Sequence, residues 1–159
     1  MQITVMCVGK LKESYLAMAE AEYKKRLQRY CKLQIVELAD QKTPDAGQEK
    51  LIAQVLETEG DAILKRIRPG AYVVALCVEA PQLSSEEFSA AIDALALEGK
   101  SELVFVIGGS LGLSEQVKAR ADLRLGFSKM TFPHQLMRVI LLEQIYRAYK
   151  IRNHEAYHK

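Results

Sequence analysis

The sequence predicts an α/β fold: a parallel β-sheet with helices on both faces. Short apolar runs rich in β-branched residues alternate with longer segments whose apolar residues recur every three or four positions. Strands that alternate with helices are typical of parallel sheets, because parallel neighbours need a crossover connection. The chain has 159 residues, 49% of them hydrophobic, which is enough for one core. We therefore expect one domain that spans residues 1–159.

In the first half of the chain, the pattern predicts strands at 3–8, 33–38 and 72–78, and helices over 15–30 and 51–67. A polar loop that contains Pro44 and Gly47 precedes the second helix, and Pro69-Gly70 ends it. The run from 72 to 78 is almost continuously apolar, as expected for a strand covered on both faces.

In the second half, Ser84 followed by serine and two glutamates predicts the start of a helix that continues to about 97. Further on, we expect strands at 103–107 and 123–127, a short helix from Ser114 and a long helix over 133–152. Open parallel sheets bind ligands beyond the carboxyl ends of their strands, so the site is expected after Val78, Ile107 and Phe127.

Several classes of protein are not indicated by the composition. No signal peptide is evident, and no apolar stretch approaches the roughly 20 residues that span a bilayer, so we expect a cytoplasmic protein without a membrane partner. The cysteines are odd in number and lack CxxC spacing, and burial is expected for all three rather than a metal site or disulfide: Cys7, Cys31 and Cys77.

Positive charge gathers near the C-terminus. The net charge is +2, but residues 128–159 hold six Lys or Arg against two acids, and also all three histidines. This distribution favours a surface that faces a polyanion, although a helix with a solvated cationic face would produce it equally well. The expected last helix is also apolar around more of its circumference than one core contact requires. It is either deeply buried or packed against a second subunit, and we expect an isologous homodimer.

A glycine-rich loop, Gly108-Gly109-Ser110-Leu111-Gly112, follows the expected fourth strand. It is either a tight turn or a place where backbone amides approach a ligand, and it lacks the dinucleotide fingerprint and the GK[ST] of phosphate loops. The loop also satisfies the G-x-S-x-G pattern of α/β-hydrolases, for which a triad could formally use Ser110, then Asp122 or Glu115, then His134.

Two further segments have open interpretations. The stretch 126–135 mixes hydroxyl and bulky apolar groups, so it is either a plain loop before a helix or a wrapping for an apolar, hydrogen-bonding ligand such as an adenine. The tail, 152–159, is either a frayed end or an aromatic and cationic group that stacks on a nucleotide base.

Four motifs follow one another in the second half of the chain: Ile107-Gly108-Gly109-x-x-Gly112-Leu113, Phe132-Pro133-His134 with Arg138, Glu143-x-x-Tyr146-Arg147-Ala148 and His154-x-x-Tyr157-His158-Lys159. Together with the opening Val8-Gly9-Lys10, they resemble the ribosomal RNA large subunit methyltransferase H family of the SPOUT superfamily. Each motif is weak alone, but their order and spacing across the whole chain are specific. The resemblance implies a C-terminal trefoil knot, which general rules of chain topology would not predict.

The resemblance also implies S-adenosylmethionine as methyl donor, no metal, and methylation at N3 of a pseudouridine in 23S ribosomal RNA of the assembled ribosome. The cofactor contacts that it implies are Leu76, Gly108, Phe127, Ser128, Lys129, Met130, Thr131 and Phe132. As a hypothesis, His158 accepts or relays a proton, Tyr157 stacks on or orients the base, and Arg147 and Arg138 stabilise charge or grip phosphate. A small RNA- or ribosome-binding factor without chemistry is the non-enzymatic alternative, and it would leave the glycine loop without a role.

Overall fold

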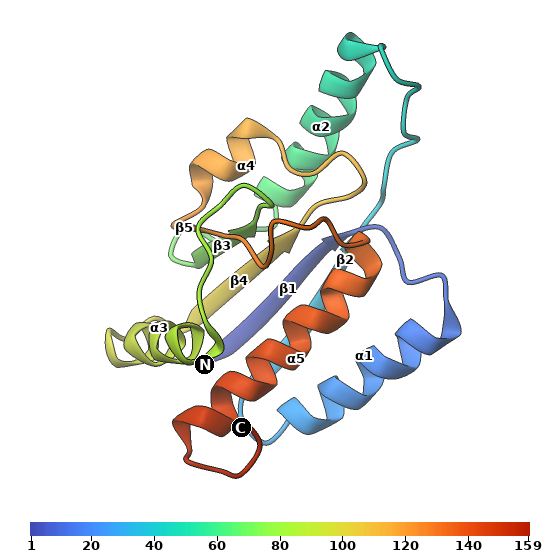
Figure 1. Ribbon diagram of the computed structural model, residues 1–159. Helices are drawn as coiled ribbons and strands as arrows, with labels where there is room; N and C mark the ends of the chain where they lie inside the picture. The colour runs from blue at the N-terminus through green and yellow to red at the C-terminus, as the bar shows by residue number, and fades with distance from the viewer.

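The computed structural model describes residues 1–159 and contains one five-stranded sheet with five helices (Figure 1). The strands are β1 (Gln2–Val8), β2 (Lys32–Leu38), β3 (Tyr72–Leu76), β4 (Glu102–Ile107) and β5 (Leu123–Leu125). The helices are α1 (Ser14–Leu27), α2 (Glu49–Leu64), α3 (Ser85–Leu97), α4 (Glu115–Arg120) and α5 (His134–Arg152).

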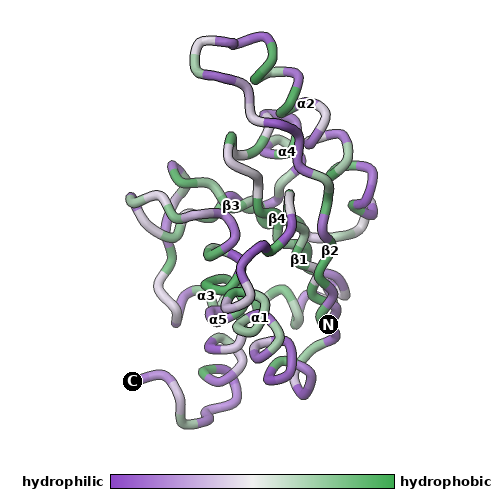
Figure 2. The backbone as a smooth tube through the Cα atoms, turned by 90° about the vertical axis from the view of Figure 1, so that its right-hand side faces the viewer, coloured by the Kyte–Doolittle hydropathy of each residue, from purple (hydrophilic) through white to green (hydrophobic).

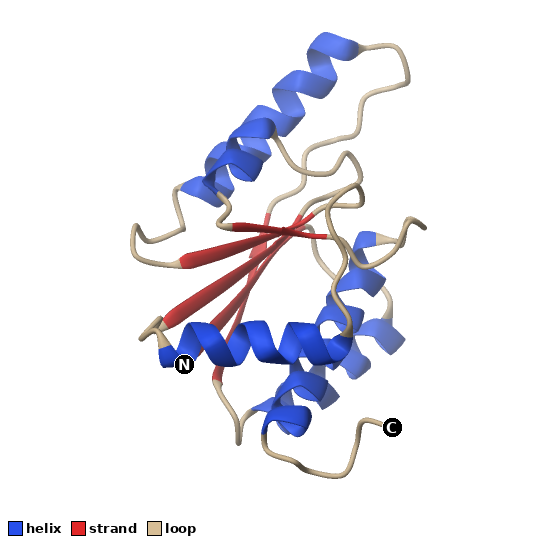
Figure 3. Cartoon of the chain, turned by 60° about the vertical axis from the view of Figure 1, so that its left-hand side comes forward, coloured by secondary structure: helices blue, strands red, loops and turns tan.

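Every strand pair in the sheet is parallel, in the order β2-β1-β4-β3-β5. Helices α1, α3 and α5 cover one face, and α2 and α4 cover the other (Figures 1 and 3). The predicted α/β class, with a parallel sheet and helices on both faces, is therefore confirmed.

Side chains alternate between the two faces of the sheet along the central strands, and this alternation divides the core into two layers. In β1, Ile3 and Val5 face the α1/α3/α5 layer, while Met6 faces the α2/α4 layer. In β4, Phe105 and Val106 alternate in the same way, and both are fully buried. Figure 2 shows these strands in hydrophobic colours, whereas hydrophilic colours lie along outer loops and the C-terminal tail.

Helix starts follow local capping signals. Ser84 caps α3 through a reciprocal capping box with Glu87, and the Ser114 hydroxyl accepts from the Val117 amide at the start of α4. Two of the cysteines, Cys7 and Cys77, are buried as expected, and Cys31 is partly buried. None of the helices has the length and apolarity needed to cross a bilayer.

Two strands end two residues earlier than predicted, at Leu76 and Leu125. The Cys77 amide donates to the Leu125 carbonyl, and the Gly126 amide then donates to the Pro81 carbonyl in the loop that leads to α3. The backbone leaves the regular ladder there to pair with a loop. The two segments that follow β3 and β5 therefore lie against each other at the carboxyl edge of the sheet.

Candidate functional site

A pocket of about 690 Å³ lies at the carboxyl edge of the sheet. Its walls are the segments that follow β3, β4 and β5, together with the first turn of α5. These are the strand ends at which the sequence predicted a site. The volume falls in the range typical of small-molecule sites.

Close backbone packing shapes the glycine loop. A Cβ atom on Gly108 would lie 2.5 Å from the Gly112 carbonyl oxygen, and Gly112 has a φ of +81°. Glycine is therefore required at both positions for the loop to close on itself. The three glycines of this loop line the pocket wall, together with Ser110 and Leu111.

The hydrolase triad is not formed. The Ser110 hydroxyl lies 2.8 Å from the hydroxyl of Thr43, and no histidine or carboxylate is hydrogen-bonded to it. Asp122 instead accepts from the Val73 amide and pairs with Arg120. The nucleophile, base and acid that such a mechanism requires are thus not connected.

The segment after β5 offers unused hydrogen-bond donors. Within 127–132 only the Met130 amide has a partner in the chain, the Ser128 hydroxyl at 3.0 Å. The remaining amides of this segment donate to no protein acceptor. Gly126, which precedes them, is held so close to the Ala80 carbonyl that a side chain would collide with it. Backbone donors among apolar side chains suit a ligand that combines hydrogen-bond acceptors with apolar surface.

Of the eight predicted cofactor residues, Lys129 does not line this pocket. The other seven do: Leu76, Gly108, Phe127, Ser128, Met130, Thr131 and Phe132. The fold therefore brings together residues that lie up to 56 positions apart, from 76 to 132. Their contact with a methyl donor stays a prediction.

The sequence did not indicate Met137, Glu79 or Lys118 as pocket residues, yet all three line it. His134 also lines it, as a member of the stretch 126–135 that was considered as a ligand wrapping, although it was not among the implied cofactor contacts. Burial lowers the pKa of His134, which favours the neutral imidazole. Helical spacing could have found Met137, since it lies one turn after His134 at the start of α5.

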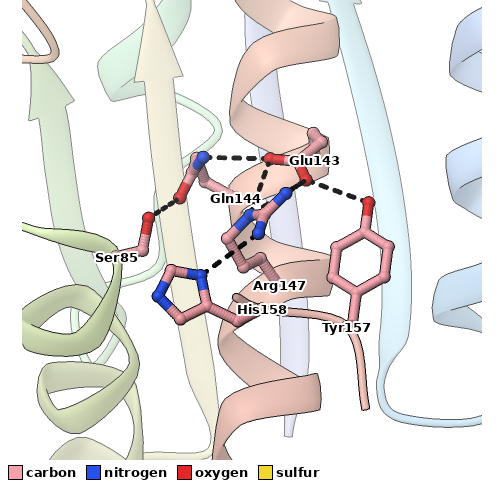
Figure 4. Close-up of polar contacts among 6 residues, drawn as sticks. All are labelled: Ser85, Glu143, Gln144, Arg147, Tyr157 and His158. Atoms are coloured by element: carbon pink, nitrogen blue, oxygen red, sulfur yellow. Dashed lines mark hydrogen bonds and ion pairs between the residues drawn. The ribbon is translucent and has the colours of Figure 1, made fainter.

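The C-terminal tail folds back onto α5, where Glu143 joins several polar groups (Figure 4). The Arg147 guanidinium donates to Glu143 at 2.7 Å, and the Tyr157 hydroxyl donates to the same carboxylate at 3.1 Å. The His158 ring lies between Arg147 and Glu86, at 3.1 and 2.7 Å. The tail is therefore docked rather than frayed.

These contacts specify the hydrogen positions on two tail residues. A guanidinium only donates, so His158 Nδ1 accepts from Arg147 and the Nε2–H donates to Glu86. Burial, with a smaller contribution from Glu143, raises the pKa of Tyr157 to about 12, so its phenol stays protonated. Tyr157 can thus donate or stack, and His158 must release Arg147 before Nδ1 can accept a proton from another group.

Arg138 lies apart from the tail, and its side chain is only 2% exposed. Its guanidinium pairs with Glu20 of α1 at 3.0 Å and Glu37 of β2 at 2.7 Å, and it donates to the Gly9 carbonyl. A direct contact with phosphate would require these bonds to break. Burial and pairing favour a positioning role, in which Arg138 fixes the start of α5 beside the pocket.

Within one chain, the pocket and the tail are separated. Arg147 lies about 15 Å along α5 from Met137, at 1.5 Å per residue. Met137 lines the pocket, whereas Arg147 holds the tail. The structure therefore brings Arg147, Tyr157 and His158 together with one another, but not with the predicted cofactor residues of the same chain.

The sequence matches a family model described as "Predicted SPOUT methyltransferase" over residues 1–158. It is 59% identical to a protein of Clostridium novyi and 58% identical to one of Bifidobacterium animalis, and each alignment covers 100% of both chains. A protein of Clostridium tetani is 57% identical over the same full length. All three relatives are named Ribosomal RNA large subunit methyltransferase H, which confirms the resemblance seen in the motifs.

Among solved structures, a probable methylase family protein from Haemophilus influenzae superposes with a TM-score of 0.58 at 13% identity, covering 99% of this chain and 70% of that one. At this identity the likeness concerns the fold alone. The family match and the full-length relatives carry the assignment: this chain belongs to the SPOUT methyltransferase family.

Proposed function

We propose that this protein transfers a methyl group from S-adenosylmethionine to N3 of a pseudouridine in 23S ribosomal RNA of the assembled ribosome. The observation that carries the proposal is the full-length identity of 57–59% to proteins named Ribosomal RNA large subunit methyltransferase H. The choice of pseudouridine and of N3 rests on the family resemblance. Such an enzyme would work in the cytoplasm, where ribosomes are.

The pocket is the proposed cofactor site. S-adenosylmethionine supplies a methyl group activated by its sulfonium. The free amides of 127–132 can hold polar edges of the cofactor, while Leu76 and Phe127 pack on its apolar parts. Gly108 allows close approach of the backbone. Positioning of this kind can supply a large part of the acceleration of a two-substrate reaction.

The acceptor nitrogen becomes a good nucleophile only when its imide proton leaves. We assign proton acceptance to His158, stacking or orientation of the base to Tyr157, and stabilisation of the resulting anion to Arg147. Arg138 is the fourth predicted residue, and its burial supports a positioning role. In the docked tail these groups are held by Glu143 and Glu86, so RNA must replace some of these contacts.

A second subunit would complete the site. A proton acceptor must lie within hydrogen-bond reach of the base, and the tail of the same chain is about 15 Å from the pocket wall along α5. One stripe of α5 carries the exposed Leu136 and then the partly buried Ile140 and Glu143. Two helices packed antiparallel along this stripe would place the tail of one subunit beside the pocket of its partner. We therefore propose a homodimer with shared sites.

We also propose that residues 1–159 form a single SPOUT-type domain with the trefoil knot of that superfamily. Support comes from the connection between β5 and α5. It starts at one edge of the sheet, is bonded through Gly126 to the loop after β3, and leads into α5, which packs against both α1 and α3.

Calorimetric titration with S-adenosylmethionine tests the donor half of this proposal. We expect each chain to bind at most one S-adenosylmethionine, and we expect no binding to a variant in which a larger side chain fills the pocket. If the purified protein bound no S-adenosylmethionine, the methyltransferase proposal would fail.

A further inference from the structure

A second cationic surface lies beside the tail. The end of α1 and the turn after it hold five Lys or Arg between residues 22 and 32, against the single acid Glu22. Along the sequence, positive charge had been noted only at the C-terminal end, 128–159. The fold puts both segments side by side, since α1 runs next to α5 (Figure 1).

Tyrosine rings connect the two segments. The Tyr146 ring of α5 lies 6.3 Å from that of Tyr23 and 5.0 Å from that of Tyr157 in the tail. The Arg26 guanidinium lies over both Tyr23 and Tyr146, at 5.3 and 5.6 Å. The Tyr30 hydroxyl donates to Glu155 at 2.8 Å. The end of α1 therefore contacts the tail that is proposed to receive the target base.

The acids in this region are already neutralised, whereas four of the five cations are not: Lys24, Lys25, Arg29 and Lys32. Glu22 pairs with Arg26, Glu155 pairs with Lys150, and Glu143 pairs with Arg147. In contrast, Lys25 and Arg29 are exposed and have no carboxylate within ion-pair distance. Lys25 lies in the last turn of α1, and Arg29 lies four residues later, in the turn that follows Leu27.

We propose that Lys25 and Arg29 form a docking surface for the RNA phosphate backbone, next to the tail that handles the target base. Unpaired exposed cations attract phosphates and release their counterions, which supplies affinity without reading sequence. The neighbouring tyrosine and arginine contacts hold this end of α1 against the tail. The inference rests on the proposed function, because it assigns the same RNA a second contact surface.

The test compares two double variants with equal loss of charge. Lys25→Gln/Arg29→Gln removes the surface, and Lys65→Gln/Arg66→Gln removes two exposed cations that follow α2, on the other face of the sheet. Binding to ribosomes is measured by co-sedimentation over a series of salt concentrations. Neither variant touches the cofactor pocket or the tail residues with proposed catalytic roles.

The association constant for ribosomes decreases with salt, and a plot of its logarithm against the logarithm of the salt concentration has a negative slope. For Lys25→Gln/Arg29→Gln we expect this slope to be smaller in magnitude by about 1.4 to 1.8, the value for two phosphate contacts. At 0.1 M salt this is a loss of roughly 25- to 60-fold in affinity, taking the two contacts to contribute nothing at 1 M. The KM for ribosomes should rise accordingly, with kcat and cofactor affinity unchanged. The α2 variant should behave as the unmodified protein.

Equal binding by both double variants would overturn the proposal. So would a loss on ribosomes without a matching loss on protein-free 23S RNA at low salt, because the surface would then dock on a ribosomal protein. Co-sedimentation does not depend on turnover. A protein that binds ribosomes through this surface but transfers no methyl group would therefore contradict the proposed function and leave the docking surface intact.

Discussion

At the scale of single residues, His158 is the most specific part of the mechanism. Replacement of His158 by Ala should lower turnover by about 10² to 10⁴, the usual contribution of a general base, while cofactor affinity stays the same. Single-turnover methyl transfer and calorimetry measure the two quantities. His154→Ala is the matched control, since His154 is exposed and makes no side-chain hydrogen bond. Unchanged turnover in His158→Ala would remove this residue from the mechanism.

Glu59 determines a pH dependence of stability. Burial raises its pKa, an effect that the Gln41 amide opposes and Asp40 reinforces. Because the folded-state pKa is above the unfolded value, the stabilisation from this group is complete below about pH 4.3 and is lost as the pH rises through the folded pKa. At pH 7 the ionised carboxylate therefore lowers stability.

Glu59→Gln keeps an acceptor for the Gln41 amide but removes the charge. We expect this variant to raise the free energy of unfolding at pH 7 by on the order of 1 kcal/mol, a common size for single substitutions. The gain should shrink at pH 5, as measured by urea unfolding at both values. Glu57→Gln, at an exposed position of the same helix, is the control. A Glu59→Gln gain that was larger at pH 5 than at pH 7 would contradict this account.

Single residues also show where sequence-based prediction ends. Arg138 was predicted as a catalytic candidate from its place in a motif, yet its side chain is 2% exposed and pairs with Glu20 and Glu37. These partners are 118 and 101 positions away along the chain, and no local pattern indicates them. The docked tail was equally hidden, since Glu86 and Glu143 meet His158 and Tyr157 only after α3 and α5 pack together.

At the scale of elements, the glycine loop after β4 should control cofactor affinity. A Cβ at Gly108 would meet the Gly112 backbone at 2.5 Å, and backbone cannot yield as a flexible side chain can. Gly108→Ala should therefore weaken S-adenosylmethionine binding by at least about tenfold, or 1.4 kcal/mol. Gly70→Ala has open space around it and is the control for calorimetry. Equal affinity in the two variants would mean that the loop does not contact the cofactor.

The elements themselves were largely predictable. Period-two and period-three-to-four patterns gave all ten elements within a few residues, and Ser84 and Ser114 correctly indicated two helix starts. The predicted strands at β3 and β5 were two residues too long at their carboxyl ends, because apolar residues continue into segments that pair with loops rather than with strands. The pocket position followed from the rule on strand ends, whereas its lining by His134 and Met137 depended on where α5 begins.

At the scale of the whole molecule, the shared site makes a quantitative prediction. A mixture of Gly108→Ala and His158→Ala subunits, unfolded and refolded together, should form heterodimers with one intact pocket facing one intact tail. Random pairing makes about half of the dimers mixed, so methyl transfer should recover to about a quarter of the unmodified level. Each variant refolded alone is the control. If the mixture recovered no activity, the site would lie within one chain.

The central claim is methyl transfer from S-adenosylmethionine to the ribosome, and one measurement tests it directly. The purified protein is incubated with labelled S-adenosylmethionine and assembled ribosomes from cells that lack the enzyme, and the 23S RNA is digested to nucleosides. We predict label in one N3-methylated pseudouridine per large subunit, and none without the protein. Cofactor binding without any label in 23S RNA would keep the SPOUT fold and contradict the proposed substrate.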